Sequence, residues 1–183
     1  TQVTGYAYYK VAWCNYNLKH YARALLGMEK AILWAREQKR EGQSQVLSLR
    51  REASQDLISI YAEFGEVKKA LDYYESFIGK GAYSWIEKLA ARYDETGQYE
   101  KSSYLYNVLI SMGEAPEKNV SHYAKMIEGY FRLQDWDMVL SATEEFGERF
   151  GNEMKEVASA DSPASVAEKS LRDIALAQHF EFK

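Results

Sequence analysis

The sequence predicts an all-α fold for its 183 residues, with three observations in support. Proline and glycine are scarce, at 2 and 11 residues. Apolar side chains recur at spacings of three and four, which is the period of an amphipathic helix. With 46% hydrophobic and 27% charged residues, the chain can bury a core in water. We therefore expect a single helical domain, residues 1–183, with no sheet.

Internal repetition organises the predicted helices. Four segments, about 5–38, 51–84, 83–116 and 120–153, can be laid over one another, and each predicts an antiparallel helix pair. The clearest is the second, whose matching positions are Leu57, Ile58, Tyr61, Gly65, Ala70, Tyr74 and Phe77. This spacing resembles the tetratricopeptide repeat (TPR), with its pattern W-x2-L-G-x2-Y, A-x3-F and Pro over about 34 residues.

The other segments carry the same pattern with substitutions. The third matches through Ile86, Leu89, Ala90, Tyr93, Gly97, Tyr99, Ser102, Tyr106 and Leu109. The fourth has Val139 for the usual alanine and Gln134 for the turn glycine, and the first has Lys19 at that glycine position. In the first segment the predicted packing face is Tyr8, Val11, Ala12 and Asn15. The resemblance implies a right-handed superhelix, a TPR-like α-solenoid in which neighbouring pairs bury each other's apolar faces. In this register we expect Glu63, Glu87 and Asp94 to be exposed and the following residues to be mostly buried: Tyr61, Ala70, Tyr74, Tyr93, Tyr106 and Tyr130.

A final stretch, about 163–183, resembles the first helix of a fifth repeat, which brings the expected number of helices to about nine. Ser162 and Pro163 predict its start, as N-cap and first helical residue. We expect this helix to be unpaired, with an uncapped apolar face at Leu171, Ile174 and Ala175. Because the chain does not begin with Met and ends on Phe-Glu-Phe-Lys, we interpret it as an excised piece or a mature fragment of a longer protein.

The connections are predicted from glycine positions. Gly65 and Gly97 stand where a helix commonly ends in a left-handed residue, which glycine adopts without a steric cost. The long link between the first two segments predicts two helices that are prolonged on either side of Gly42, rather than a loop.

Charge and motif content favour some function classes and disfavour others. The net charge is −4, yet residues 1–50 hold eight Lys and Arg against three Asp and Glu. The basic side chains cluster around one turn instead of forming the continuous face that nucleic acid requires, so no nucleic-acid partner is expected. No apolar stretch approaches the roughly 20 residues that would cross a bilayer.

Catalytic and metal chemistry find little support in the sequence. The lone Cys14 cannot form an intrachain disulfide, and His20, His122 and His179 stand far apart, outside metal-binding spacings. A Cys14–His20 dyad is conceivable, but a buried thiol in a helix is the preferred interpretation. No phosphate-binding loop or nucleophile elbow is present. We therefore expect no enzyme activity, metal or cofactor.

The TPR resemblance implies a concave face lined by the first helix of each pair. In this register the candidate binding residues are Tyr6, Tyr9, Trp13, Tyr16, Glu63, Glu87, Asp94, Glu95, Glu128, Phe131 and Arg132. The face would be aromatic at its start and acidic in its middle. Tyr6, Tyr9, Trp13 and Tyr16 recur at i, i+3, i+7 and i+10, which places them on one helical stripe.

This aromatic stripe has three interpretations. A preceding repeat, or the fold itself, could cover it. It could instead anchor a partner peptide, since Tyr and Trp are enriched at binding hot spots. The third interpretation is a contact between copies of the chain.

The functional expectation is a non-catalytic scaffold that binds a protein or peptide through the concave face, within a larger multi-repeat protein or complex. The alternative is a regulatory module that changes conformation when it binds a peptide, as TPR-like domains of bacterial regulators do. Self-association through uncapped terminal helices stays open. The irregular repeats, with Tyr-Tyr-Lys-Val-Ala-Trp-Cys at 8–14, also resemble arrays in bacterial envelope proteins. A periplasmic or envelope location is therefore expected, with the cytoplasm as the alternative.

Overall fold

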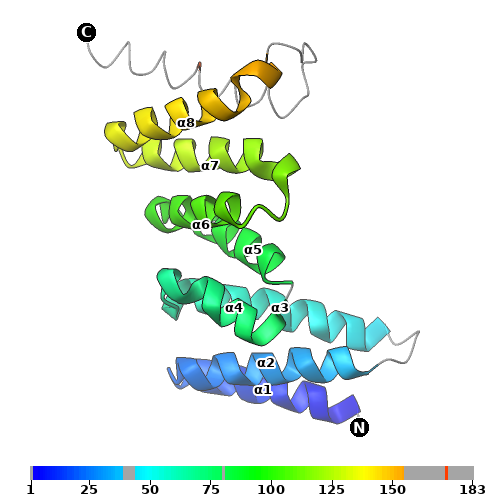
Figure 1. The fold of residues 1–183 in the computed structure, drawn as a ribbon. Helices are drawn as coiled ribbons and strands as arrows, with labels where there is room; N and C mark the ends of the chain where they lie inside the picture. The colour runs from blue at the N-terminus through cyan, green and yellow to red at the C-terminus, as the bar shows by residue number, and fades with distance from the viewer. Residues whose placement is uncertain (1, 39–43, 80, 155–171, 173–183) are drawn as a thin grey trace. The chain divides into compact units, whose positions relative to one another are not determined.

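The computed structural model describes residues 2–38, 44–79, 81–154 and 172. These residues form eight α-helices and two short 3-10 helices, with no β-strand among them (Figure 1). The predicted all-α class is therefore confirmed. The expected ninth helix, its start at Ser162 and Pro163, and the face at Leu171, Ile174 and Ala175 lie outside the described residues.

The α-helices follow one another as four pairs. Their bounds are α1 (Gln2–Asn17), α2 (Tyr21–Glu37), α3 (Ser44–Phe64), α4 (Ala70–Ile78), α5 (Ala82–Glu95), α6 (Tyr99–Met112), α7 (Asn119–Arg132) and α8 (Trp136–Met154). The 3-10 helices η1 (Val67–Lys69) and η2 (Pro116–Lys118) precede α4 and α7. The chain divides into two compact units, Thr1–Trp85 and Ile86–Lys183, with the boundary inside α5.

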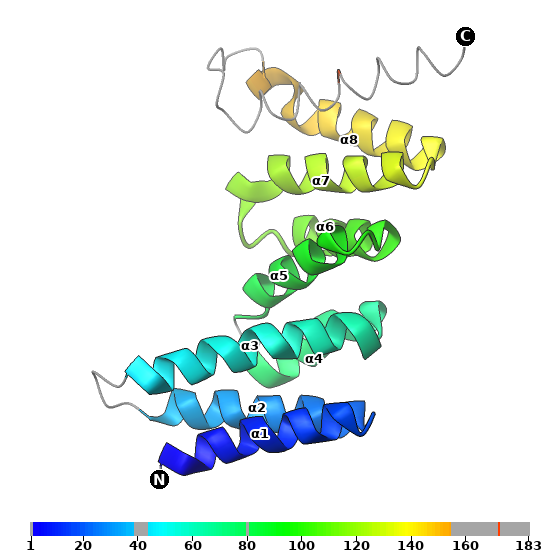
Figure 2. The ribbon, with the colours of Figure 1, turned by 180° about the vertical axis from the view of Figure 1, so that it is seen from behind.

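In the first unit, α2 packs against both α1 and α3 (Figure 2). Small residues allow the close crossing of α1 and α2, because a Cβ atom added at Gly27 would lie 2.7 Å from the Cβ atom of Ala12. Ala12 and Ala24 are fully buried. The largest fully buried side chains of this unit are Met28, Ile32, Leu49, Leu57 and Tyr74.

In the second unit, α7 packs against α6 and α8. Ser103 on α6 is buried and donates a hydrogen bond of 3.2 Å from its hydroxyl to the backbone carbonyl of Met126. Gly129 lies one turn further along α7, and its missing side chain leaves room for Ser103. The fully buried large side chains here are Ile86, Leu89, Tyr93, Leu105, Leu109, Tyr123 and Phe146.

Three of the four intra-pair turns share one hydrogen-bonded geometry. In each, a residue with positive φ follows the helix: Lys19 (60°), Gly97 (71°) and Gln134 (58°). Its N–H bonds to the carbonyl three residues back, and the next N–H bonds to the carbonyl five residues back. This is the Schellman arrangement, which uses carbonyls left free at a helix end. The predicted left-handed residue at Gly97 is confirmed, and the same conformation occurs without glycine at the other two positions.

The prediction of a left-handed residue at Gly65 is wrong. Gly65 is not among the residues with positive φ, and this turn continues into η1. Glycine is required there for a different reason, because a Cβ atom would lie within 2.5 Å of the Tyr61 ring. The turn between α3 and α4 therefore depends on close packing and not on backbone handedness.

The second helix pair begins earlier than the repeat register requires. Helix α3 starts at Ser44 and is 21 residues long, so the prediction that a helix is prolonged after Gly42 is confirmed on that side.

The predicted burial is mostly right. Tyr61, Ala70, Tyr74, Tyr93 and Tyr106 are buried, and Tyr130 is half-buried.

On α1 the predicted packing face is wrong in part. Tyr8 and Val11 are exposed and Asn15 is half-buried, so only Ala12 packs as expected. Helix α2 meets α1 along the side of Gly5 and Ala12, which are both buried. Cys14, expected to be a buried thiol, is also exposed.

Candidate functional site

The aromatic stripe of α1 faces α3, where two carboxylates accept its hydrogen bonds. The Tyr9 hydroxyl donates to Oδ2 of Asp56 at 2.6 Å, and the Trp13 indole Nε1 donates to the same oxygen at 3.2 Å. The Tyr16 hydroxyl donates to Oε2 of Glu63 at 2.7 Å. The first helices of two successive pairs are thereby joined through aromatic side chains.

Ring contacts hold the C-terminal end of this stripe. Trp13 and Tyr16 meet edge to face with centroids 5.3 Å apart, and Tyr16 meets Phe64 at 6.1 Å. Tyr21, at the start of α2, stacks on Phe64. Aromatic pairs of this kind add to stability beyond the area that they bury.

We call this region the α1–α3 surface, defined by Tyr6, Tyr9, Trp13, Tyr16, Glu52, Asp56 and Glu63. Tyr9, Trp13 and Tyr16 are half-buried, whereas Tyr6, Glu52 and Glu63 are exposed. The structure shows that the fold itself covers the aromatic stripe in part, because α3 contacts Tyr9, Trp13 and Tyr16. The rings are held in place and still reach solvent.

The charge of the α1–α3 surface is negative. Among the described residues, no Lys, Arg or His forms an ion pair with Glu52, Asp56 or Glu63. Burial and the Asp56 carboxylate raise the pKa of the Tyr9 hydroxyl. The hydrogen bond to Glu63, followed by burial, raises the pKa of Tyr16. Both tyrosines therefore remain neutral donors at physiological pH, and the carboxylates keep unused lone pairs for further donors.

Three of the four predicted acidic residues of the second unit, Glu87, Asp94 and Glu128, form ion pairs with basic side chains of η2 and α7. Lys118 Nζ lies 2.8 Å from Oε1 of Glu87, and Lys125 Nζ lies 3.3 Å from Oδ2 of Asp94. Lys125 also pairs with Glu128, which Arg132 approaches from the next turn.

Exposure follows these pairings. The side chains of Glu87 and Asp94 are only 31% and 18% exposed, although both were predicted to be exposed. Glu63, predicted to be exposed, is exposed.

Glu87 also contacts a buried histidine. Nε2 of His122 lies 3.3 Å from Oε1 of Glu87, and the Tyr106 ring stacks on the imidazole. Burial lowers the pKa of His122, and Glu87 offsets this only in part. Burial by itself would raise the pKa of Glu87, but the hydrogen bonds from Lys118 and His122 lower it overall. The cluster holds a neutral imidazole beside a charged carboxylate.

The remaining predicted site residues make local contacts in the second unit. Phe131 meets Trp136 edge to face at 5.4 Å. Glu95 pairs with Arg92 of its own helix at 3.5 Å, and both are exposed.

Sequence reasoning missed the residue that organises the α1–α3 surface. Asp56 accepts two of its hydrogen bonds but was not among the predicted residues. A signal was present, because Asp56 lies four residues after Glu52 and seven before Glu63, which places all three on one face of a helix. The pairing of Lys118 and Lys125 with α5 was also missed.

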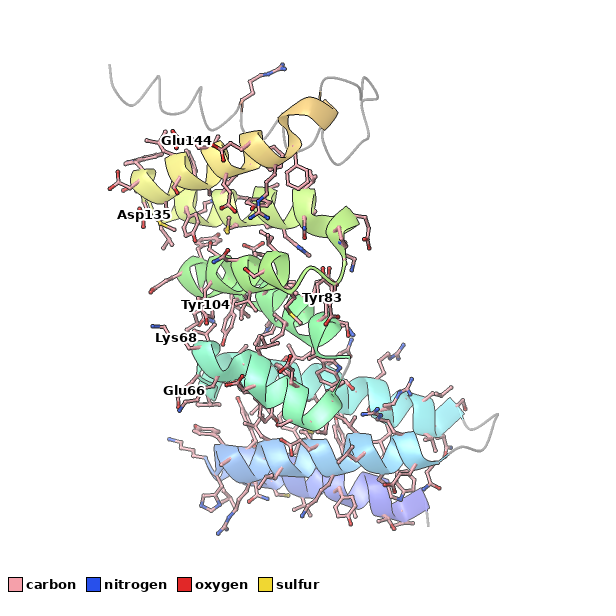
Figure 3. The ribbon with its side chains drawn as sticks, in the orientation of Figure 1. Glu66, Lys68, Tyr83, Tyr104, Asp135 and Glu144 are labelled. Carbon is pink, nitrogen blue, oxygen red and sulfur yellow. The ribbon has the colours of Figure 1, made fainter. Side chains whose placement is uncertain are left out.

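A recess opens beside the connection from α3 to α4. It has a volume of about 470 Å³ and is lined by Tyr61, Phe64, Gly65, Glu66, Lys69, Asp72, Tyr73 and Ser76. Figure 3 labels Glu66 and Lys68 at this connection. The Tyr61 hydroxyl donates to the Glu66 carbonyl at 3.0 Å, and Glu66 pairs with Lys69. Glu66 and Lys69 are therefore engaged within the connection, whereas the Tyr73 hydroxyl donates to Glu29 of α2.

The described part of the chain contains neither a candidate metal site nor a candidate membrane span. No group of three or more His, Cys, Asp or Glu side chains there could hold a metal ion. In the same residues, no helix has the length and apolar character needed to cross a bilayer.

The chain matches no family model, and its comparison with curated proteins and with solved structures finds no match.

Proposed function

We propose that the protein is a non-catalytic scaffold that binds a protein or peptide segment through the first helices of its helix pairs. The α1–α3 surface is the proposed centre of binding. The carrying observation is that Tyr9, Trp13 and Tyr16 are anchored to Asp56 and Glu63 and still reach solvent.

Anchoring matters because a partner then meets side chains whose rotamers are already restricted. Ordering a flexible side chain at an interface costs about 0.5–1.5 kcal/mol, and preorganised rings avoid much of that cost. Tyr and Trp are also the residue types that most often dominate binding energy.

Charge selects the class of partner. Glu52, Asp56 and Glu63 carry negative charge with no ion pair from the described residues. In the second unit, Lys118 and Lys125 already pair with the acids. We therefore propose a partner segment that places Lys or Arg on the carboxylates of α3 and an apolar side chain beside Trp13.

The repeat pattern supports the scaffold proposal at the level of architecture. Four helix pairs, three of them with the same turn geometry, are typical of arrays that supply binding area without reactive groups. The resemblance to TPR proteins points to the same use of the first helices.

A peptide selection tests this proposal. Displayed 12-residue peptides would be selected on the whole chain, and we expect a consensus that combines Lys or Arg with an aromatic or large aliphatic residue. Trp13→Ala should weaken binding of the selected peptide by about 2 kcal/mol, which is a roughly 30-fold loss of affinity. The affinity would be read by fluorescence anisotropy.

Two matched charge variants test whether Glu63 contributes to the rate at which the peptide associates. Glu63→Gln should slow association and flatten its salt dependence, whereas Glu114→Gln, at an exposed loop position, should change neither. If Trp13→Ala binds normally but unfolds more easily, the stripe is packing and not a binding site.

A further inference from the structure

A second apolar stripe runs along α1, on the side away from the α1–α3 surface. Val3, Ala7, Val11, Cys14 and Leu18 recur at spacings of three and four from the start of α1 to the turn after it, and all five are exposed. The exposed fractions of Val3, Val11 and Leu18 are 73%, 56% and 64%. We call this set the outer stripe.

The helix that carries the outer stripe is apolar on all sides. Lys10 is its only charged residue, and α1 contains neither Asp nor Glu. A helix that is hydrophobic all round is normally buried all round. Helices α2 and α3 cover two sides of α1, so the outer stripe is the side that another element is needed to cover.

Basic side chains flank the outer stripe. On α1, Lys10 is exposed between the outer stripe and Tyr9, and its Nζ lies 5.7 Å from the centroid of the Tyr9 ring. On α2, Gly27 makes the close contact with Ala12, and Arg23 and Lys30 stand four residues before and three after Gly27. That spacing places both on the α1 side of α2, and both are exposed.

Charge complementarity decides between occupants. A second copy of the same face would bring one set of Lys10, Arg23 and Lys30 close to the other set, and like charges across an interface oppose association. A helix with an apolar stripe flanked by carboxylates would instead place negative charge near Lys10 on one edge of the outer stripe and near Arg23 and Lys30 on the other. The 16 residues of α1 span about 24 Å, which suits a partner helix of similar length.

We propose that the outer stripe of α1 is a docking surface for an amphipathic helix of a partner protein, with Asp and Glu flanking its apolar side chains. This surface is separate from the α1–α3 surface and would take a partner of opposite charge. One helix would therefore hold two partners on its two sides.

Two synthetic 18-residue peptides test the proposal. Both carry leucine at helical spacing, and the flanking positions are glutamate in one peptide and lysine in the other. In anisotropy titrations with the full chain, we expect saturable binding of the glutamate peptide and at least tenfold weaker binding of the lysine peptide. Equal affinities, or no saturable binding of the glutamate peptide, would overturn the proposal.

Substitutions locate the binding on the molecule. Val11→Glu changes an exposed residue, so it should leave the helical circular dichroism spectrum unchanged. It should weaken binding of the glutamate peptide at least tenfold. Leu140→Glu, at an exposed leucine of α8, is the matched control and should change nothing. Equal loss in both variants would show that the peptide binds elsewhere.

Two further measurements distinguish this proposal from binding at the α1–α3 surface and from self-association of the chain. Trp13→Ala should leave affinity for the glutamate peptide unchanged, since Trp13 lies on the α3 side of the helix. Sedimentation of the chain alone should show a monomer. A dimer that Val11→Glu dissolves would mean that a second copy occupies the stripe, and the partner-helix proposal would be wrong.

Discussion

Asp56 illustrates how one acceptor can determine a surface. One of its carboxylate oxygens receives both the Tyr9 hydroxyl and the Trp13 indole, from a helix more than forty residues away in sequence. Hydrogen bonds to a charged acceptor are stronger than neutral ones. This single residue therefore orients two of the four aromatic side chains that the sequence placed on one stripe.

We expect Asp56→Ala to destabilise the protein by about 1–3 kcal/mol, because two part-buried donors lose their acceptor. Gln55→Ala, the exposed neighbour on α3, should change stability by less than about 0.5 kcal/mol. Urea unfolding followed by circular dichroism measures both. A loss for Asp56→Ala no larger than that for Gln55→Ala would mean that these hydrogen bonds contribute nothing net.

His122 makes stability depend on pH. Its folded-state pKa lies below the ordinary value of 6.5, since burial disfavours the charged ring. The unfolded chain therefore binds more protons as the pH drops below about 6.5, and stability falls toward the lowered folded-state pKa. Glu87 acts in the same direction at lower pH, because its pKa is below the ordinary value of 4.5.

The corresponding test is a series of urea midpoints between pH 7.5 and 5.5. We expect the midpoint of the wild-type chain to fall with pH, and His122→Gln to flatten that fall. His20→Gln, at an exposed position, should retain it. A pH profile that is the same in all three proteins would contradict the assignment to His122.

At the scale of the element, the turns show the same backbone path with different residues. Lys19, Gly97 and Gln134 all adopt a left-handed conformation, which costs a non-glycine residue roughly 1 kcal/mol. The hydrogen bonds that close each turn hold the conformation in spite of that cost.

A reciprocal pair of substitutions measures this cost. Gly97→Ala should destabilise by about 1 kcal/mol, and the loss would be conformational because an added Cβ atom meets nothing within 4 Å. Gln134→Gly should stabilise by about 0.5–1 kcal/mol for the same reason. Thermal unfolding of the two variants checks both signs, and a stabilising Gly97→Ala would refute the argument.

The helices could be predicted from sequence because their signal is local. Apolar spacing and scarce proline correctly predicted an all-helical chain, and the left-handed residue at Gly97 was also predicted correctly. Gly65 was not, because a glycine needed for close approach to Tyr61 looks the same in sequence as one needed for a left-handed turn.

The candidate site was harder to predict because it depends on which helices meet. The stripe on α1 was visible from its period, and spacing placed Asp56 on one helix face with Glu52 and Glu63. The sequence did not indicate that this face meets α1, or that Lys125 pairs with Asp94. The side of α1 that packs on α2 was also predicted wrongly, because Tyr8 and Val11 are exposed. A helix that is apolar on all sides does not show in its sequence which side meets its neighbour.

For the whole molecule, each compact unit has its own buried side chains. Leu57 in the first unit is fully buried and Leu105 in the second is 1% exposed. Replacing either by alanine should cost about 2–5 kcal/mol. In repeat proteins the effect of such a loss is greatest in the neighbouring elements.

Hydrogen exchange read by mass spectrometry tests that expectation. Leu57→Ala should reduce protection most in α2, α3 and α4, and Leu105→Ala most in α6, α7 and α8. A uniform loss of protection along the chain in both variants would show that the protein opens as one cooperative body.

The division into two units also makes the protein optically asymmetric. Its four tryptophans are Trp13, Trp34 and Trp85 in the first unit and Trp136 alone in the second. Intrinsic fluorescence is thus weighted toward the first unit, and the indole of Trp13 beside a carboxylate gives that unit a distinctive chromophore. In a Trp136→Phe chain the emission would come from the first unit alone, and the difference from wild type would isolate the second without any added dye.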